Sequence, residues 1–342
     1  MLGLVPCSRP TNRRPARQRF LYLVLDDWER GYSIFRVGED DLDSDVGLDA
    51  HLAESPVVRI QAQHWFEVSF AAHGTKILAM HPSRFSPGIP VFDTETLGVT
   101  MCSFPKSRTG LGAHKLVYAS VGDSILAFVS RFLELLGPEP LPAEKESSWS
   151  WASIEPPPPF ESNCVSSYAL HPDGRTVVMS VKNWGSKNDW HIHKRSSTFA
   201  FDTERLEWTH LGEWLLPFKG RGHYDRDLDA WIGLCRFEQE RQTMPAWKLG
   251  KHVFFDVDSI RHKGATLVYM GDGKFCLIEC RLPEDYESYP CSRKLKITSC
   301  VLKYDKYGEL VTTHCRSYSS ISYQTAREHL NLEIEDPVAF WM

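Results

Sequence analysis

The chain has 342 residues, of which 42% are hydrophobic, and this apolar content is ample for a packed core and argues against disorder. Its formal net charge of −5 gives no general attraction to nucleic acid or to a membrane surface. The nine cysteines are odd in number and no Asn-x-Ser/Thr sequon is present, which indicates reduced thiols rather than a disulfide framework. No apolar run approaches the roughly 18 residues of a membrane span, so we expect a soluble intracellular protein, cytoplasmic or nuclear.

The first 19 residues form a basic segment without an acidic side chain. Its five arginines are Arg9, Arg13, Arg14, Arg17 and Arg19. We expect residues 1–19 to be a disordered basic arm, because they show no amphipathic pattern and little serine; a targeting peptide and a short nuclear-import signal remain alternatives. The segment is too short for a second folded module, so residues 20–342 are expected to form a single domain.

An apolar strand is predicted at the start of that domain. Phe20–Leu25 is a continuous apolar run, typical of a strand buried on both faces, and Tyr32–Val37 reads as the strand that returns. Glu39–Asp49 alternates carboxylates as a calcium loop does. Because it lacks the glycine and the glutamate that such a loop needs at its sixth and twelfth positions, we expect a solvated loop.

From Val57 onward, pairs of short strands recur around turns that contain Gly or Asp. The turns are His73-Gly74, Gly122-Asp123, Pro172-Asp173-Gly174 and Gly271-Asp272-Gly273. Each is a hairpin signal. Thr198–Thr209 adds two further strands around Asp202, and weaker copies of it lie at Pro90–Thr100 and Leu302–Leu310. Two hairpins in succession make a four-stranded unit, the blade of a propeller.

The presumed outer strands recur at a mean spacing of about 56 residues, close to the kelch period. They lie near Ile34, Met101, Trp151, Trp208, Trp247 and Thr312. The sequence therefore predicts an all-β fold, a six-bladed kelch-like β-propeller with four-stranded antiparallel blades. Helical periodicity is confined to Arg131–Leu136, which Gly137-Pro138 stops.

Two packing expectations follow from this fold. A ring of blades is stable only when its first and last blades are joined, so Phe20–Leu25 or Pro337–Trp341 should pair with, or pack on, the blade formed by the other end. Trp151, Trp208 and Trp247 should bury their rings between blades rather than bind a ligand, because a ligand would not recur once per blade.

Candidate chemical groups are few. His191 and His193 share a strand face and could share a metal, but no third ligand is identifiable. Asp225, Asp227 and Asp229 are expected on one strand face, and the positions that follow fail the calcium-loop motif. Four cysteines, Cys276, Cys280, Cys291 and Cys300, complete no paired-cysteine signature, although structural zinc stays an alternative. No catalytic or cofactor-binding motif is found, so we predict no enzyme, no cofactor and no metal.

Several stretches resemble an uncharacterised plant family, much expanded in grasses and labelled only as domain of unknown function 1668. They are Leu21–Ser33, Tyr168–Thr176, Trp214–Gly220, Leu228–Leu234, Gly264–Asp272 and Pro337–Met342. The chain is also similar to the kelch propellers that follow F-boxes in plants, but it has no room for an F-box before Phe20. The resemblance implies no activity and no site residue.

Three functions remain open. The first is a non-catalytic protein-interaction scaffold, a monomer that binds a protein partner through loops on one face. The second is a carbohydrate- or small-molecule-binding, lectin-like propeller, with Trp184, Trp190 and Trp231 as candidate stacking platforms. The third is a degenerate propeller enzyme that uses the mouth of the channel. Fold alone does not choose among them.

Overall fold

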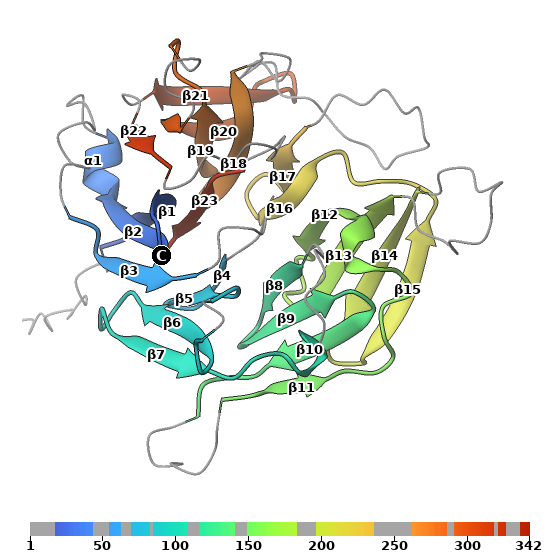
Figure 1. Cartoon of the computed structure of the whole chain (residues 1–342). Coiled ribbons are helices and arrows are strands. Elements are labelled where there is room, and N and C mark those ends of the chain that lie inside the picture. Colours follow the sequence, from blue (N-terminus) through green and yellow to red (C-terminus); the bar gives the residue numbers. More distant parts are fainter. Residues whose placement is uncertain are drawn as a thin grey trace, which may run out of the picture.

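A ring of β-sheets surrounds a central axis, with one or two strands of each sheet beside that axis (Figure 1). The computed structural model describes residues 18–43, 55–62, 70–82, 85–108, 116–140, 149–182, 196–235, 261–285, 291–317, 321–325 and 336–342. Five sheets occur in this part of the chain, and most of their strand pairs are antiparallel. The arrangement confirms the predicted all-β propeller.

The first sheet joins the two ends of the described chain. Its strands, from the axis outward, are β23 (Val338–Trp341), β1 (Phe20–Trp28), β2 (Gly31–Gly38) and β3 (Val58–Gln61). β23 pairs antiparallel with β1, with Leu21 opposite Trp341. The amide of Phe20 donates to the carbonyl of Met342 at 2.8 Å, and the amide of Met342 donates back at 3.1 Å. The predicted closure by the two terminal segments is confirmed.

The second and third sheets are regular four-stranded antiparallel blades. Their strands are β4 (Phe70–His73), β5 (Lys76–Ala79), β6 (Ile89–Asp93) and β7 (Val99–Cys102), then β8 (Val117–Val121), β9 (Ser124–Val129), β10 (Phe132–Leu136) and β11 (Trp151–Ser153). Asp93 ends β6 and accepts a hydrogen bond from the amide of Glu95 at 2.8 Å. This side-chain bond forms the turn that the Phe-Asp-Thr pattern predicts.

Arg131–Leu136, the best candidate for helical periodicity, is not helical. Phe132–Leu136 form β10, in which Leu135 lies opposite Leu126 of β9. Leu133 and Leu136 are buried in the packing between sheets. A short apolar segment has no strong local preference, so burial against neighbouring strands decides its conformation.

The fourth sheet departs from the predicted pattern of four antiparallel strands. It contains β15 (Glu207–Gly212), β14 (Ser196–Asp202), β13 (Thr176–Lys182) and β12 (Val165–Leu170), and continues into β16 (Lys219–Asp225) and β17 (Ala230–Leu234). β12 and β16 pair in parallel, with Tyr168 opposite Arg221. The innermost strands of a propeller run in the same direction, so two that come within hydrogen-bonding distance must pair in parallel.

The fifth sheet has the longest strands. It contains β18 (His262–Gly271), β19 (Lys274–Arg281), β20 (Ser292–Tyr304) and β21 (Leu310–Ser317), and β22 (Ile321–Gln324) pairs with the other end of β20. Met101, Trp151, Trp208 and Thr312 lie in outermost strands, as predicted. Ile34 does not, because β23 enters the first sheet at the axis and makes β2 its third strand. Trp247 lies outside the described residues.

Three short helices connect strands within the described residues. They are α1 (Glu39–Asp43), η2 (Lys106–Arg108) and η3 (Ser162–Cys164). The acidic stretch predicted as a loop therefore begins as a helical turn, because Leu42 is fully buried and anchors it to the core; residues 44–49 lie outside the described part. None of the helices in the described ranges has the length and apolar character needed to cross a bilayer.

Apolar clusters fill the space between neighbouring sheets. Leu21 and Leu23 of the first sheet pack with Ile278 and Ile297 of the fifth. On the opposite face of β1, the side chain of Tyr22 packs against the second sheet. Because alternate residues of β1 contact both neighbouring sheets, its Phe20–Leu25 part is apolar on both faces.

Two predicted inter-blade tryptophans pack as expected. Trp151 of β11 is 2% exposed and packs with Leu78 and Val91 of the second sheet. Trp208 of β15 is half-buried, and its ring lies edge-on to Phe128 of the third sheet, with centroids 6.2 Å apart. Both side chains therefore belong to the packing between sheets.

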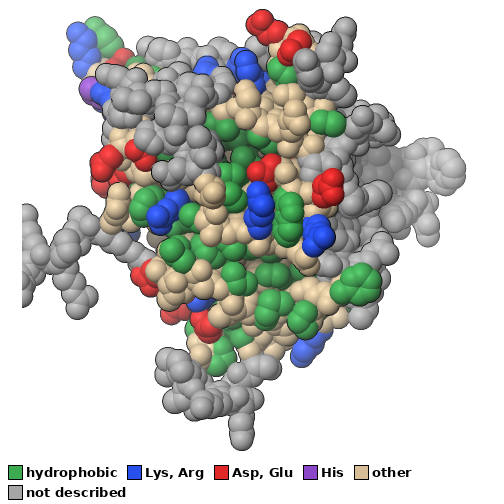
Figure 2. All heavy atoms as spheres, turned by 60° about the vertical axis from the view of Figure 1, so that its left-hand side comes forward, with side chains coloured by type: hydrophobic (Ala, Val, Ile, Leu, Met, Phe, Trp, Pro, Cys, Tyr) green, Lys and Arg blue, Asp and Glu red, His purple; other side chains and the backbone are tan. Residues whose placement is uncertain are grey.

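The outer surface mixes apolar and charged side chains. Figure 2 shows hydrophobic groups interspersed with lysine, arginine and acidic side chains over the face seen there. On the edge strand β7, Val99 is 51% exposed and Met101 is 43% exposed. Because the two residues are two positions apart, they share one face of that strand.

Candidate functional site

The innermost strands enclose a cavity of about 460 Å³ at the centre of the ring. The lining comes mainly from the six strands β4, β8, β12, β16, β18 and β23, and Ile125 of β9 also contributes. The volume lies within the range of about 300–1,000 Å³ that small-molecule sites occupy. Polar side chains from different strands converge there, among them Ser120, Tyr168, Arg221, His223 and Thr266. This central cavity is the candidate site.

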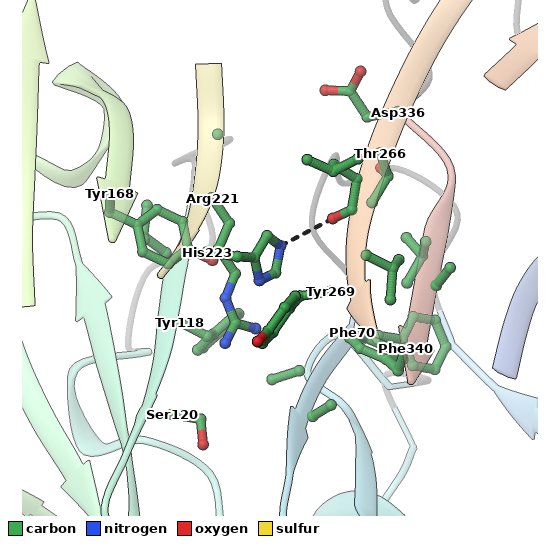
Figure 3. Close-up of a pocket in the computed structure, with 18 of the residues that line it drawn as sticks. Phe70, Tyr118, Ser120, Tyr168, Arg221, His223, Thr266, Tyr269, Asp336 and Phe340 are labelled. Carbon is green, nitrogen blue, oxygen red and sulfur yellow. Dashed lines mark hydrogen bonds between the residues drawn. The ribbon is translucent and has the colours of Figure 1, made fainter. Parts of the chain in front are cut away.

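Two basic side chains of β16 face the cavity. Arg221 and His223 are two residues apart, so they lie on the same side of the strand. Figure 3 shows both extending into the cavity, toward Tyr118 and Tyr269. Between them, Gly222 leaves room behind β16 for the ring of Phe218, which lies 2.3 Å from the position that a Cβ on Gly222 would occupy. The glycine lets a buried phenylalanine support the strand that carries the two basic groups.

Arg221 sits beside an aromatic wall. Its register partner on β12 is Tyr168, and directly opposed residues of paired strands project from the same face. Burial raises the pKa of Tyr168, and the positive charge of Arg221 partly offsets that shift. The hydroxyl of Tyr168 therefore stays protonated and can donate a hydrogen bond into the cavity.

His223 is neutral in this environment. Its Nε2 lies 3.0 Å from the carbonyl oxygen of Leu267 on β18, an arrangement in which Nε2–H donates to the carbonyl (Figure 3). Desolvation, followed by the positive charge of Arg221, lowers the pKa of His223 to about 3. Arg221 is therefore the positively charged member of this pair at neutral pH.

The neutral state of His223 should make folding stability depend on pH. An unfolded histidine protonates near pH 6.5, so the stabilisation is fully present above that pH and is lost as the pH falls from about 6.5 toward 3. Between pH 7.5 and pH 5, the free energy of unfolding should fall by about 2 kcal/mol through His223 alone. In His223→Gln, whose amide can still donate to Leu267, urea unfolding at the two pH values should show a loss smaller by that amount. Equal losses in the two proteins would contradict the assignment.

A buried carboxylate fixes the hairpin that carries these groups. Asp225 is fully buried and accepts hydrogen bonds from the amides of Leu228 at 2.9 Å and Gly273 at 2.8 Å. Burial, followed by the hydrogen bond to Asp225, raises the pKa of Tyr269 to about 12. Asp225 thus ties the β16–β17 turn to the β18–β19 turn. The predicted arrangement of three aspartates on one strand face is wrong, because Asp227 and Asp229 belong to that turn.

Other polar groups of the cavity are paired with one another. Nδ1 of His73 on β4 lies 2.7 Å from Oγ of Ser120 on β8, and burial lowers the pKa of His73. Asp336 receives Nζ of Lys219 at 2.9 Å, so this lysine and this carboxylate neutralise each other. Arg221, in contrast, has no carboxylate within ion-pair distance among the described residues, and its side chain is exposed to the cavity.

Of the predicted stacking tryptophans, only Trp231 lies in the described ranges. It is half-buried on β17 and packs with Ala169 of β12 and Val178 of β13, outside the cavity lining. Its Nε1–H donates to the carbonyl of Leu170 at 2.9 Å, and its ring centroid is 6.1 Å from that of His171. Trp184, Trp190, His191 and His193 lie outside the described residues.

The cysteines highlighted in the sequence are dispersed. Cys276 and Cys280 belong to the core between the first and fifth sheets, whereas Cys300 packs against the β16–β17 hairpin. Cys291 is half-buried. Within the described ranges, no group of three or more His, Cys, Asp or Glu side chains is placed to hold a metal ion.

Sequence reasoning missed Arg221 and His223. The available signal was Lys219-Gly-Arg-Gly-His-Tyr-Asp, in which glycines alternate with basic side chains. Alternation places Arg221 and His223 on one face, and interior glycines mark a close approach of other groups.

A family model described as "Protein of unknown function (DUF1668)" matches residues 18–320. Comparison with curated proteins finds no match. Among solved structures, the N-terminal domain of Nup159 is 9% identical, with a TM-score of 0.27, and the match covers 83% of this chain and 56% of that one. The tricorn protease is 10% identical, with a TM-score of 0.36 and coverage of 95% and 36%. An ancestral GH74 enzyme is 10% identical, with a TM-score of 0.32 and coverage of 89% and 32%. The chain thus spans about half or less of each of these solved chains. Because the TM-scores are below 0.5, the propeller assignment is based on the arrangement of the sheets in this structure and not on these similarities.

Proposed function

Because this chain belongs to the DUF1668 family, for which no function is described, we propose its function from its own geometry: a six-bladed, non-catalytic binding propeller. The blade count is supported by the β16–β17 hairpin. One cluster packs Phe218 and Trp231 against strands β12 and β13, and a separate cluster packs Leu228 and Ile232 against the fifth sheet. A hairpin with an apolar interface on each side occupies the place of a blade, and β16 is its innermost strand.

The proposed activity is protein interaction, with a segment of the partner entering the central cavity from the loops on one face. The observation that carries it is the cavity itself, a concave site where polar and aromatic groups from six strands converge. Propellers use this central region for binding because the loops around it vary without disturbing the blades. A small-molecule ligand is the second candidate, which the volume of about 460 Å³ favours.

Site-specific crosslinking tests the proposal. A photoreactive amino acid is placed at Ala72, a half-buried cavity residue of β4, and in a matched control at Thr100, an exposed residue of the outer strand β7. After incubation with grass tissue extract and irradiation, a protein partner should be captured from position 72 and not from position 100. Native mass spectrometry of the purified chain tests the second candidate through a retained small molecule. Capture of a partner only from position 100 would overturn binding at the cavity. The absence of both a captured partner and a retained small molecule would overturn it too.

A further inference from the structure

Arg221 has an unusual electrostatic position in the cavity. Its guanidinium is exposed to the cavity, and no described carboxylate lies within ion-pair distance of it. The acidic groups nearby are engaged elsewhere: Asp336 with Lys219, and Asp225 with two backbone amides. A guanidinium binds most strongly to an anion that accepts two parallel hydrogen bonds from it.

The surroundings of Arg221 add aromatic rings without adding a second positive charge. His223 is neutral because burial, followed by the charge of Arg221, lowers its pKa, and its Nε2–H donates to the carbonyl of Leu267. Tyr118, Tyr168 and Tyr269 contribute rings to the lining (Figure 3). This part of the cavity therefore presents one positive charge, that of Arg221, next to a wall of aromatic rings.

We infer that the central cavity binds a carboxylate, held in a bidentate pair by Arg221 with the rest of the ligand against the tyrosine rings. The inference rests on the proposed function and names the chemistry that the same cavity recognises. A single guanidinium matches the single charge of a carboxylate, whereas a phosphate monoester carries about −1.5 to −2 at pH 7. The carboxylate belongs either to a small free acid or to an acidic side chain of a partner segment.

NMR of the arginine Nε–H groups provides the direct test. The probes are benzoate for a free acid, the peptide acetyl-Gly-Glu-Gly-amide for a chain segment, and benzamide and the Gln peptide as neutral analogues. The Arg221 signal, assigned by its loss in Arg221→Gln, should shift saturably with at least one acidic probe and with neither neutral analogue. Inorganic phosphate should bind at least tenfold more weakly than the better acidic probe.

Variants distinguish a specific ion pair with Arg221 from a general attraction to positive charge. Arg221→Gln should weaken the better acidic probe at least tenfold, and Arg221→Lys should fall between it and the wild type, because lysine keeps the charge but loses the bidentate geometry. Arg226→Gln removes an exposed arginine from the turn of the same hairpin and should change affinity less than twofold. No saturable shift with either acid, or equal effects of the two Gln variants, would overturn the inference. A partner still captured at position 72 by Arg221→Gln would overturn the carboxylate pair and leave the proposed function standing.

Discussion

Deletion of residues 337–342 should lower the free energy of unfolding by at least about 5 kcal/mol, because it removes β23, the innermost strand of the first sheet. Val338, Phe340 and Trp341 are partly buried against the core, and burying such a side chain contributes about 1.5–3 kcal/mol. The deletion also removes the carbonyl of Pro337, which accepts from the hydroxyl of Thr266 and so joins β18 to this strand. The first and fifth sheets would lose the strand that connects them.

Urea unfolding monitored by tryptophan fluorescence and circular dichroism measures this effect. The matched control adds β23 back as a separate peptide, because the strand stabilises the protein through its pairing with β1 and not through its covalent link to the chain. A synthetic peptide of residues 336–342 should restore part of the lost stability in a concentration-dependent way, and a scrambled peptide should not. A truncated chain as stable as the full one would show that β23 is dispensable for closure.

Trp151→Ala should cost about 3–5 kcal/mol of unfolding free energy, as expected for a tryptophan truncated in a core. The side chain is 2% exposed, and its Nε1–H donates to the carbonyl of Ser103 at 2.9 Å. The substitution leaves a cavity between the second and third sheets and strands that buried carbonyl without its donor. Both losses destabilise the same interface.

Two further variants provide reference values for the loss of unfolding free energy in Trp151→Ala. Phe132→Ala truncates an aromatic residue of the neighbouring strand β10 that is 57% exposed, so its cost should stay within about 0.5 kcal/mol. Trp208→Ala should be intermediate, because its half-buried ring packs edge-on to Phe160 at 5.3 Å. Thermal and urea unfolding of the three variants should give this order. A cost for Trp151→Ala equal to that for Phe132→Ala would contradict its packing role.

Hairpins and turns were predictable because their determinants are local. In the Phe-Asp-Thr copies, Asp202 accepts from the amides of Glu204 at 2.9 Å and Arg205 at 3.0 Å, as Asp93 does in the second sheet. The same short-range bond forms wherever the same residues recur. Ring closure was predictable too. Phe20–Leu25 is too apolar for a strand with one face in water, so other parts of the ring were expected to cover it on both faces.

The candidate site could not be read from the sequence in the same way. Arg221 was assigned no role, because its environment comes from strands far apart in the chain, including β8, β12 and β18. Trp231 was proposed as a stacking platform on its residue type alone, and the structure places it against strands β12 and β13. Residue type indicates which chemistry is available, and the neighbours decide whether it is used.

The sequence by itself determined the strand pairs, the turns between them and the apolar stripes that pack one sheet on the next. These features depend on the period-two alternation of side chains and on turn residues, which act over a few positions. Only the tertiary structure decided that β16 pairs in parallel with β12 and that Asp225 anchors its hairpin to the β18–β19 turn. Parallel pairing and the convergence of six strands on one axis are long-range contacts, whose register is set by the packing of whole blades and not by any local pattern.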